Sequence, residues 1–363
     1  MNVDIVIVGG GIAGVSAAAE LSADASVLLL EAESALGYHA SGRSAAMFLP
    51  FYGNATVRAL NAASAQHHHD AGVLTPRAFL SMAPPGKVDL LEREAAELGL
   101  DRIDMDEAVE LFPILEPGYF AAAAMTRQAW DLDTDLLLQL NRKRVLAQGG
   151  RIETRARVSD IAREDGGWRV SWQGGEARAA HVVNAAGAWA DGVAAMAGVG
   201  PLGLAPKRRS MAQMAAPGGH DVSDWPFVEE VGEAWYAKPD AGRWIVSPAE
   251  EDPVEASDAW ADDMVLAEGL ARYQDAVTVE VTRPLSTWAG LRTIAPDRTL
   301  VIGADPRARG FWWLAGQAGY GFQTAPAAAR LIADLMGGAA PDLAPATVAA
   351  LAPDRLLTER TPI

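Results

Sequence analysis

The segment Asp4 to Glu31 constrains this chain most, because it reads as a complete βαβ unit. Ile5–Val8 is long enough for a buried parallel strand, and it ends in the turn sequence Gly9-Gly10-Gly11-Ile12-Ala13-Gly14. An alanine-rich helical stretch follows, then a second apolar run and an acidic residue. The turn fits G-x-G-x-x-G in the strand–turn–helix context that binds the pyrophosphate of a dinucleotide.

Each part of this unit has a physical role. Gly9 permits the tight turn, Gly11 lets the backbone approach a pyrophosphate, and Gly14 lets the helix pack closely on the strand. The N-terminus of the helix offers free N–H groups and a positive dipole end to phosphate. Glu31 accepts hydrogen bonds from ribose hydroxyls and repels a 2′-phosphate. We therefore predict a bound adenine dinucleotide.

Composition excludes several classes of protein. The 363 residues suffice for two domains, and half of them are hydrophobic. The absence of cysteine excludes disulfides, cysteine-based metal sites and a cysteinyl-linked flavin. No apolar run approaches the ~18 residues of a transmembrane segment, and the first apolar run is a strand rather than a signal peptide. We expect a cytoplasmic protein that is either free in the cytoplasm or peripheral at a membrane through its electron acceptor.

The charge pattern argues against nucleic-acid binding. The net charge is −17, and the largest basic clusters are Lys207-Arg208-Arg209 and Arg142-Lys143-Arg144. His67-His68-His69 does not predict a metal site, because consecutive helical residues point about 100° apart. We predict no metal centre.

Periodicity and turn residues predict further elements. Helices are expected at 55–71, 88–98, 135–147 and 326–336, and strands at 181–186 (turning at Gly187 into a helix), 235–238, 244–247, 299–303 and 311–315. The alternation in 151–172 predicts two antiparallel strands. No second G-x-G-x-x-G follows a strand, so the one dinucleotide is expected to be a flavin that takes its electrons directly from substrate.

Separated motifs along nearly the whole chain resemble the FAD-dependent D-amino acid oxidase family, and most of all bacterial D-arginine dehydrogenase-type enzymes. The motifs are the N-terminal fingerprint, Gly37-Tyr38-His39-Ala40-Ser41-Gly42-Arg43-Ser44-Ala45-Ala46, Asn184-Ala185-Ala186-Gly187-Ala188-Trp189, Pro201-Leu202-Gly203-Leu204, Pro206-Lys207-Arg208-Arg209-Ser210, Trp288-Ala289-Gly290-Leu291-Arg292 and Gly316 to Gln323.

The resemblance implies an α/β fold in which a Rossmann-type FAD-binding domain carries an α+β substrate domain with a mixed antiparallel sheet. Residues 1–46, 140–204 and 290–363 would form the FAD-binding domain, and residues 47–139 and 205–289 the substrate-binding domain. It also implies noncovalent FAD and hydride transfer from the substrate Cα to flavin N5. The imino acid product would then hydrolyse to a 2-oxo acid and ammonia.

The resemblance also assigns the residues that contact FAD. Arg43 would pair with phosphate charge, Ser44 would donate to it, and the helix near Gln323 would direct its N-terminus at the flavin. The full set is Gly9, Gly11, Ile12, Ala13, Gly14, Glu31, Ala32, Gly42, Arg43, Ser44, Ala45, Ala46, Val158, Ala186, Gly187, Trp189, Gly290, Arg292, Gly319, Tyr320, Gly321, Phe322 and Gln323.

Four side chains form the expected substrate clamp: Tyr52, Arg209, Tyr236 and Arg292. A guanidinium can hold an α-carboxylate through two parallel hydrogen bonds, and a phenol can add a donor and close the pocket. The neighbouring Arg208 is an alternative to Arg209. A backbone carbonyl at Gly319 would orient the substrate amine.

The chain departs from the basic-substrate enzymes where the cationic end of their substrate arrives. By the resemblance, Phe79 and Met47 stand in place of a carboxylate and a histidine, with Leu49 nearby. A buried cation without a carboxylate partner is costly. We therefore predict neutral, apolar D-amino acids as substrates, and a quinone or O2 as electron acceptor.

Three alternatives stay open on the sequence alone. The clamp would equally serve a secondary amine such as sarcosine or an opine, or a 2-hydroxy acid. An NAD-dependent Rossmann dehydrogenase would leave the C-terminal glycine loop and Arg292 without a role. A flavin-binding protein without turnover, acting as a sensor or scaffold, is the third.

Overall fold

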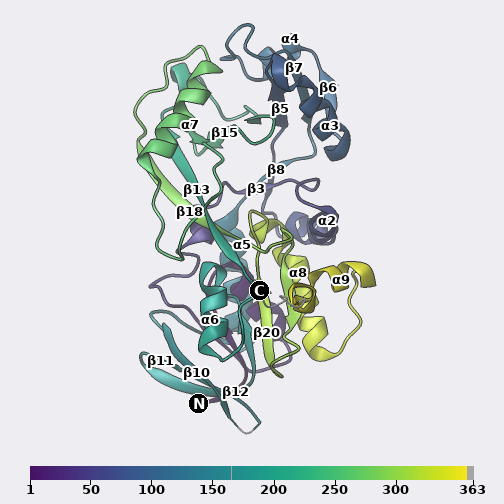
Figure 1. Cartoon of the computed structure of the whole chain (residues 1–363), viewed down its shortest axis with the longest axis vertical. Coiled ribbons are helices and arrows are strands. Elements are labelled where there is room, and N and C mark those ends of the chain that lie inside the picture. Colours follow the sequence, from purple (N-terminus) through teal and green to yellow (C-terminus); the bar gives the residue numbers. More distant parts are fainter. Residues whose placement is uncertain (165, 358–363) are drawn as a thin grey trace, which may run out of the picture.

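The computed structural model describes residues 1–164 and 166–357, and it arranges them as two sheets stacked along the long axis of the molecule (Figure 1). In the part of the chain described, one sheet has eight strands, one has nine, and a small third sheet has three. The N-terminal βαβ unit belongs to the eight-stranded sheet at one end. The predicted fold class, a Rossmann-type domain with an α+β domain, is confirmed.

The eight-stranded sheet has the order β10-β11-β12-β1-β2-β9, with β20 beside β12 and β19 beside β20. Its centre is parallel, and β10, β11 and β19 join it in antiparallel pairs. The strands are β1 (Asn2–Val8), β2 (Val27–Leu30), β9 (Arg151–Glu153), β10 (Val158–Glu164), β11 (Gly167–Trp172), β12 (Gly175–Asn184), β19 (Val301–Ala304) and β20 (Phe311–Ala315).

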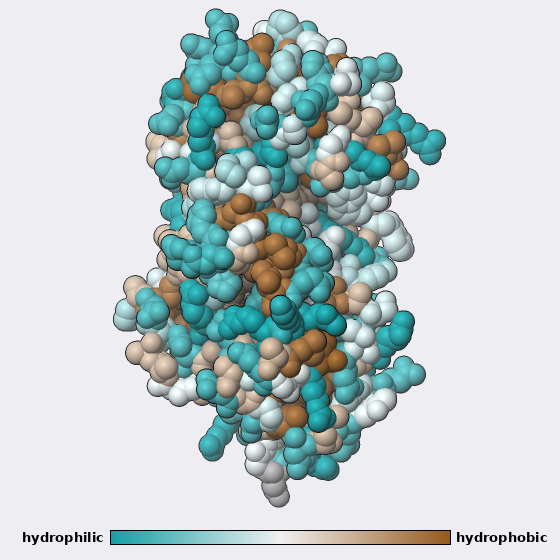
Figure 2. All heavy atoms as spheres, turned by 180° about the vertical axis from the view of Figure 1, so that it is seen from behind, coloured by the Kyte–Doolittle hydropathy of each residue, from teal (hydrophilic) through white to brown (hydrophobic). Residues whose placement is uncertain are grey.

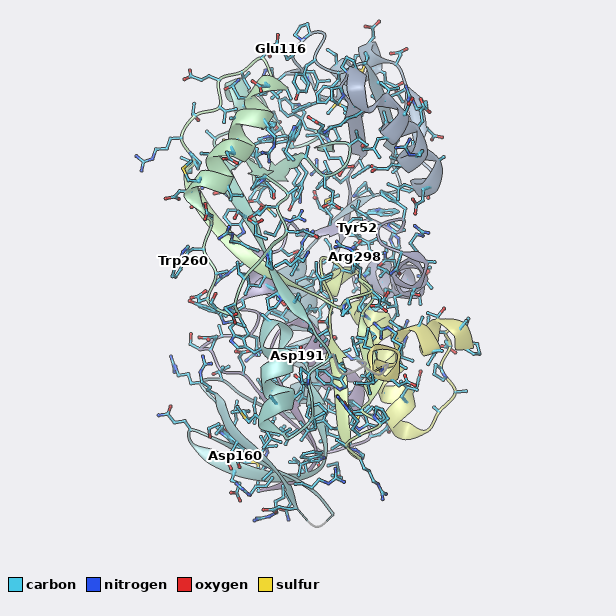
Figure 3. All side chains as sticks on the ribbon, in the orientation of Figure 1. Tyr52, Glu116, Asp160, Asp191, Trp260 and Arg298 are labelled. Atoms are coloured by element: carbon cyan, nitrogen blue, oxygen red, sulfur yellow. The ribbon has the colours of Figure 1, made fainter. Side chains whose placement is uncertain are left out.

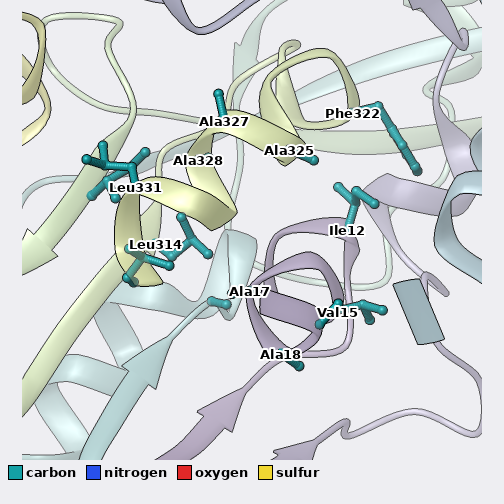
Figure 4. Packing of buried hydrophobic residues seen from close by; sticks show 14 of the residues in the cluster. Ile12, Val15, Ala17, Ala18, Leu314, Phe322, Ala325, Ala327, Ala328 and Leu331 are labelled. Carbon is teal, nitrogen blue, oxygen red and sulfur yellow. The ribbon is translucent and has the colours of Figure 1, made fainter. Parts of the chain in front are cut away.

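Helices α1 (Ile12–Leu21), α5 (Thr134–Ala147) and α8 (Gly321–Gly337) cover one face of this sheet, and α6 (Ala190–Met196) packs on the other. The facing sides of α1 and α8 carry small residues, among them Ala17, Ala18 and Ala328, all of which are buried (Figure 4). Small side chains let two helices approach closely while apolar burial at ~25 cal/mol per Å² stabilises the contact. This packing holds the N-termini of both helices beside the turn that follows β1.

The nine-stranded sheet has the order β17-β13-β16-β15-β14-β5-β7-β6, with β18 along the other side of β13. Most of its pairs are antiparallel, but β14 runs parallel to β5. The strands are β5 (Phe79–Ala83), β6 (Asp101–Ile103), β7 (Ala122–Thr126), β13 (Ala205–Met214), β14 (Phe227–Glu230), β15 (Trp235–Asp240), β16 (Arg243–Ser247), β17 (Asp252–Pro253) and β18 (Ser286–Ile294).

The remaining elements surround this sheet or join it to the first. The small sheet consists of β3 (Met47–Phe48), β4 (Leu74–Pro76) and β8 (Trp130–Leu132), and α2 (Ala55–Asp70) packs on α8. The other helices are α3 (Val88–Leu98), α4 (Met105–Leu111), α7 (Asp263–Asp275) and α9 (Pro345–Leu351). Helix α5 runs through residue 140 and β18 through residue 290, so each continues across a predicted domain boundary.

The elements predicted from periodicity mostly appear, with two corrections. The stretch 151–172 contains three strands rather than two, because β9 leaves the hairpin to pair in parallel with β2. The last long helix begins at Gly321 rather than at Pro326. The prediction started the helix at Pro326 because proline is favoured in the first turn of a helix. In the structure the five residues before Pro326 are helical as well.

Candidate active site

A cavity of about 800 Å³ lies where the two sheets meet. The first turn of α1, the loop 37–46 and the start of α8 line it from one side, and β5, β13, β14 and β15 line it from the other. Figure 3 labels Tyr52 and Arg298 near this junction, about halfway along the molecule. From behind, hydrophilic residues cover much of the surface and apolar ones gather near mid-height (Figure 2).

The glycine turn after β1 is too crowded for a side chain at Gly9, Gly10 or Gly14. Gly9 has φ +113°, and a Cβ there would lie 2.4 Å from the carbonyl oxygen of Ala185. A Cβ on Gly14 would lie 1.9 Å from the Gly9 carbonyl oxygen. Helix α1 has no side-chain cap at Gly11, and its first turn lines the cavity. Uncapped N–H groups at the end of a helix suit an anion such as a pyrophosphate.

The acid at the end of β2 is held by the same turn. Glu31 is buried, and its carboxylate accepts hydrogen bonds from the N–H groups of Gly10 (2.6 Å) and Glu33 (2.7 Å) while facing the cavity. A Cβ on Gly10 would lie 2.7 Å from the Glu31 carboxylate. Gly10 occupies the first variable position of G-x-G-x-x-G, so the pattern does not specify this role of Gly10 in making room for Glu31. The turn, the start of α1 and the fixed acid together fit the pyrophosphate and ribose of FAD.

Ser41 is a further residue of this region that sequence reasoning left without a role. Its hydroxyl accepts a hydrogen bond from the N–H of Ile12 (3.0 Å), so it holds the loop 37–46 against the start of α1. A Ser side chain four residues into a glycine-rich loop carries little information by itself. Only the fold brings it to the helix that begins 29 residues earlier.

The guanidinium of Arg43 binds protein groups in this structure. It donates to the carbonyl oxygens of Ala259 (2.6 Å) and Ala289 (2.9 Å) and pairs with the carboxylate of Asp258, whose pKa it lowers. Through these bonds Arg43 holds the segment 257–259, which lines the cavity, against the loop 37–46. Its pairing with a phosphate stays a prediction. Ser44 faces the cavity, and its hydroxyl accepts from the N–H of Ala46 (3.0 Å).

Arg292 occupies the cavity wall on β18 with its charge unpaired. No described residue forms a hydrogen bond or ion pair with its guanidinium, which packs against Gly319 so closely that a Cβ there would lie 3.0 Å from Arg292 Cζ. Burial works to lower its pKa, but Tyr52, Tyr236 and Glu233 raise it above the usual value. Arg292 therefore stays protonated and is available to an anionic ligand.

Two tyrosines stand beside Arg292. The hydroxyl of Tyr52 donates to Glu233 (3.4 Å), and its ring meets that of Tyr320 edge-on with centroids 5.1 Å apart. Burial raises the pKa of Tyr52, so this phenol remains a neutral donor. Tyr236 is buried and donates only weakly, to the sulfur of Met211 at 3.7 Å.

The register of β13 distinguishes the two candidate arginines. Arg209 is buried at the cavity wall and pairs with Glu233 (3.3 Å) and Glu251 (3.4 Å). Arg208 points away from the cavity and pairs with Asp252 (3.3 Å). Adjacent residues on a strand face opposite sides, so only one of them can reach a ligand here. Arg209 is that residue, although its charge already has two carboxylate partners.

The three residues predicted to form an apolar wall lie at the same cavity. Met47, Leu49 and Phe79 all line the cavity, and the ring of Phe79 stacks on Phe227 with centroids 5.4 Å apart. Phe51 meets Phe79 edge-on at 5.3 Å, and Phe227 in turn stacks on Tyr236 at 5.2 Å. These rings form a continuous apolar surface that leads away from the tyrosine–arginine group.

Sequence reasoning missed the acidic groups beside this surface. Glu229 lines the cavity and accepts a hydrogen bond from the Ser81 hydroxyl (3.2 Å). Burial, with a smaller contribution from the carboxylates of Glu233 and Glu94, raises its pKa to about 8. The strand alternation of Phe227 and Glu229 puts both on one face, but only the pairing of β14 with β5 and β15 shows that this face is the cavity.

Most of the residues predicted from the resemblance line the cavity, and three do not. Gly14 packs on the turn after β1, Gly42 donates its N–H to the Gly37 carbonyl (2.6 Å), and Tyr320 is buried against Tyr52. Those that do are Gly9, Gly11, Ile12, Ala13, Glu31, Ala32, Arg43, Ser44, Ala45, Ala46, Met47, Leu49, Tyr52, Phe79, Val158, Ala186, Gly187, Trp189, Arg209, Tyr236, Gly290, Arg292, Gly319, Gly321, Phe322 and Gln323.

The histidine run contributes to packing. His68 is buried and its Nε2 bonds the carbonyl of Gln323 (2.9 Å), while His69 is exposed on α2. Burial lowers the pKa of His68 to about 4, so the ring is neutral. Among the residues described, no group of three or more acidic or histidine side chains is placed to hold a metal ion. No described helix is long and apolar enough to cross a membrane.

Comparisons with known proteins agree with this geometry. The family model described as FAD dependent oxidoreductase (DAO) matches residues 4–335. The chain is 25% identical over 370 residues to glycine oxidase of Pseudomonas putida, covering 96% of this chain and 98% of that protein. It is 30% identical over 173 residues to FAD-dependent oxidoreductase domain-containing protein 1 of Xenopus laevis, a match to 43% of this chain and only 34% of that protein.

A solved structure shows the same architecture. Glycine oxidase from Geobacillus kaustophilus superposes with a TM-score of 0.82 at 22% identity, covering 96% of this chain and 98% of that one. At this identity the likeness speaks for the fold. The family model, the glycine turn with its fixed acid and the shared architecture lead to one conclusion. The chain belongs to the DAO family of FAD-dependent oxidoreductases.

Proposed function

We propose that this protein oxidises D-amino acids with neutral, apolar side chains at the Cα–N bond. The observation that carries this proposal is Arg292, a protonated guanidinium in the cavity that no described residue pairs. An α-carboxylate supplies the missing partner through two charge-assisted hydrogen bonds. The D configuration rests on the sequence resemblance to D-arginine dehydrogenase-type enzymes.

FAD, when bound, supplies the acceptor for the hydride that leaves the substrate Cα. The protein supplies position. Arg292 would hold the carboxylate, the hydroxyls of Tyr52 and Tyr236 would close the pocket around it, and the Gly319 carbonyl would orient the amine. Fixing both groups on Cα holds its hydrogen in one place, which is the main contribution that binding can make to such a transfer.

The side-chain preference follows from the apolar wall. Met47, Leu49 and Phe79 line the cavity together, and the stacked rings of Phe227 and Tyr236 extend that surface. Burial of a substrate side chain on it would contribute about 0.8 kcal/mol for each CH2 group. The imino acid formed would hydrolyse to a 2-oxo acid and ammonia.

The same clamp would accept a secondary amine or a 2-hydroxy acid, because it recognises the carboxylate alone. The similarity to a glycine oxidase over 96% of the chain supports a small amine as the alternative substrate. An electron acceptor such as a quinone or O2, and a cytoplasmic location, stay predictions.

Anaerobic mixing of the FAD-loaded protein with a panel of substrates tests the proposal. The panel contains D-leucine, D-methionine, D-phenylalanine and D-arginine, together with L-leucine, sarcosine and D-lactate. We expect the visible absorbance of the flavin to bleach fastest with the three apolar D-amino acids. Faster bleaching by D-arginine would overturn the side-chain preference at neutral pH. Bleaching by sarcosine or D-lactate alone would move the function to a secondary amine or a hydroxy acid.

A further inference from the structure

A carboxyl group lies at the cavity wall beside the apolar surface, where the proposed reaction gives it no role. Glu229 is the third residue of β14, directly opposite Tyr236 on one side and Ser81 on the other. Phe227, two residues earlier on the same face, carries the ring on which both Tyr236 and Phe79 stack. A side chain that lies over these rings would therefore bring its end toward Glu229.

The groups around Glu229 are acidic or neutral. Helix α3 brings Glu94 and Glu97 to the cavity, and the turn after β14 brings Glu233, whose charge is shared with Arg209 of β13. Ser81 of β5 donates a hydrogen bond, and Tyr236 of β15 offers a phenol hydroxyl. Arg292 of β18 lies beside Glu233, and Glu229 has no ion-pair partner among the described residues. Glu233 thus belongs to the clamp, where it pairs with Arg209 and accepts from Tyr52, whereas Glu229 and Glu94 line the cavity with no ion pair among the described residues.

We propose that Glu229 sets the charge preference for the substrate side chain: protonated, it leaves the pocket suited to uncharged side chains, and ionised, it turns the same pocket toward cationic ones. The proposal rests on the proposed function, since it concerns the side chain of the same amino acid substrate. The preference for apolar side chains expected from Phe79 and Met47 took no account of a carboxyl group on β14, and the present proposal differs from it in this respect.

The direction of the pH dependence follows from the neighbours. Burial and the carboxylates of Glu233 and Glu94 oppose ionisation, so the pKa of about 8 puts Glu229 mostly in its neutral form at pH 7. As pH rises through this value a negative charge appears beside the rings. A substrate ammonium then gains an attractive partner at short range in a partly buried site, whereas an alkyl group gains none.

The test compares D-lysine with D-norleucine, which share a carbon chain and differ by the terminal ammonium. We expect the ratio of their kcat/KM values, lysine over norleucine, to rise roughly tenfold between about pH 6.5 and pH 9.5, a span over which the lysine ammonium with its pKa of ~10.4 stays mostly charged. Titration of the two α-amines is the same whichever protein is assayed, so comparison of the wild type with Glu229→Gln removes it from the result. In Glu229→Gln the ratio should change less than about twofold, and Glu229→Asp should restore the rise. Glu92→Gln, an exposed residue of α3 outside the cavity, is the matched control.

A second readout does not depend on turnover. A carboxyl group whose pKa is higher in the folded than in the unfolded protein binds an extra proton when folded, so its contribution to stability falls as pH rises from the unfolded value toward about 8. The melting temperature of the wild type should therefore fall relative to that of Glu229→Gln between about pH 5 and pH 8. If the melting temperatures of the two proteins changed with pH in the same way, the raised pKa assigned to Glu229 would be wrong.

The outcomes separate the two proposals. If both amino acids bleach the flavin but the ratio is flat, or rises equally in Glu229→Gln, Glu229 does not set the preference and the proposed function stands. If neither bleaches the flavin at any pH, the proposed function fails and the role of Glu229 fails with it.

Discussion

Replacing Arg292 with methionine should lower kcat/KM for D-leucine roughly a thousandfold while FAD stays bound. Two charge-assisted hydrogen bonds to a carboxylate account for about 4 kcal/mol, which corresponds to that factor. Methionine fills a similar volume, and the guanidinium forms no hydrogen bond or ion pair with any described residue that its removal would orphan. The measurement is the rate of anaerobic flavin bleaching at a series of substrate concentrations.

Two companion variants show whether substrate binding depends on the charge of Arg292 or on the geometry of its two donors. Arg292→Lys keeps the charge but loses the planar pair of donors, so it should recover only part of the lost activity. Gly319→Ala would press a methyl group against the Arg292 guanidinium and should raise KM without removing the charge. If Arg292→Met retained activity within about threefold of wild type, the carboxylate clamp would have to be placed elsewhere.

Gly14→Ala should lower the affinity for FAD roughly tenfold to a hundredfold. The added Cβ would lie 1.9 Å from the carbonyl oxygen of Gly9, an atom of the backbone that cannot move aside as a side-chain tip can. Helix α1 would have to shift from β1, at a cost of about 1–3 kcal/mol that is typical of overpacking, and its N-terminus would leave the pyrophosphate position. The FAD content of the purified protein and the dissociation constant for FAD measure the effect.

The control for this change is another helical glycine. A Cβ on Gly337, near the end of α8, meets no atom within 4 Å, so Gly337→Ala carries the same change in helix propensity without a clash. It should bind FAD as the wild type does. Equal FAD affinity in Gly14→Ala would mean that α1 does not need its close packing on β1 to hold the cofactor.

The nucleotide half of the site was predictable because its parts are local. Strand, turn, helix and Glu31 lie within one stretch of chain, and each has a recognisable residue type. What local pattern did not reveal is the packing of Gly10 on Glu31 and the bond from Ile12 to Ser41, since both depend on the path of a loop. The hydrogen bonds of Arg43 to residues 258–259 were hidden for the same reason, because more than 200 residues separate the partners.

The substrate-binding part of the site depends on the order of the strands in the sheet, and a local sequence pattern carries no information about that order. The resemblance led to Tyr52, Tyr236 and Arg292, and the structure brings them together. The resemblance alone could not choose between Arg208 and Arg209. Alternation along a strand means that the two side chains face opposite sides of the sheet, but it does not tell which side faces the cavity. Glu229 was missed because its position follows from the parallel pairing of β14 with β5, a contact between segments about 150 residues apart.

The most direct test of the central claim, that hydride leaves the substrate Cα for FAD, is the anaerobic bleaching rate with D-leucine and with D-leucine deuterated at Cα. We expect both compounds to bleach the flavin fully and deuterium to slow the reaction severalfold, because breaking the Cα–H bond would limit the observed step. A flavin that neither compound bleaches, in a protein that demonstrably holds FAD, would contradict it.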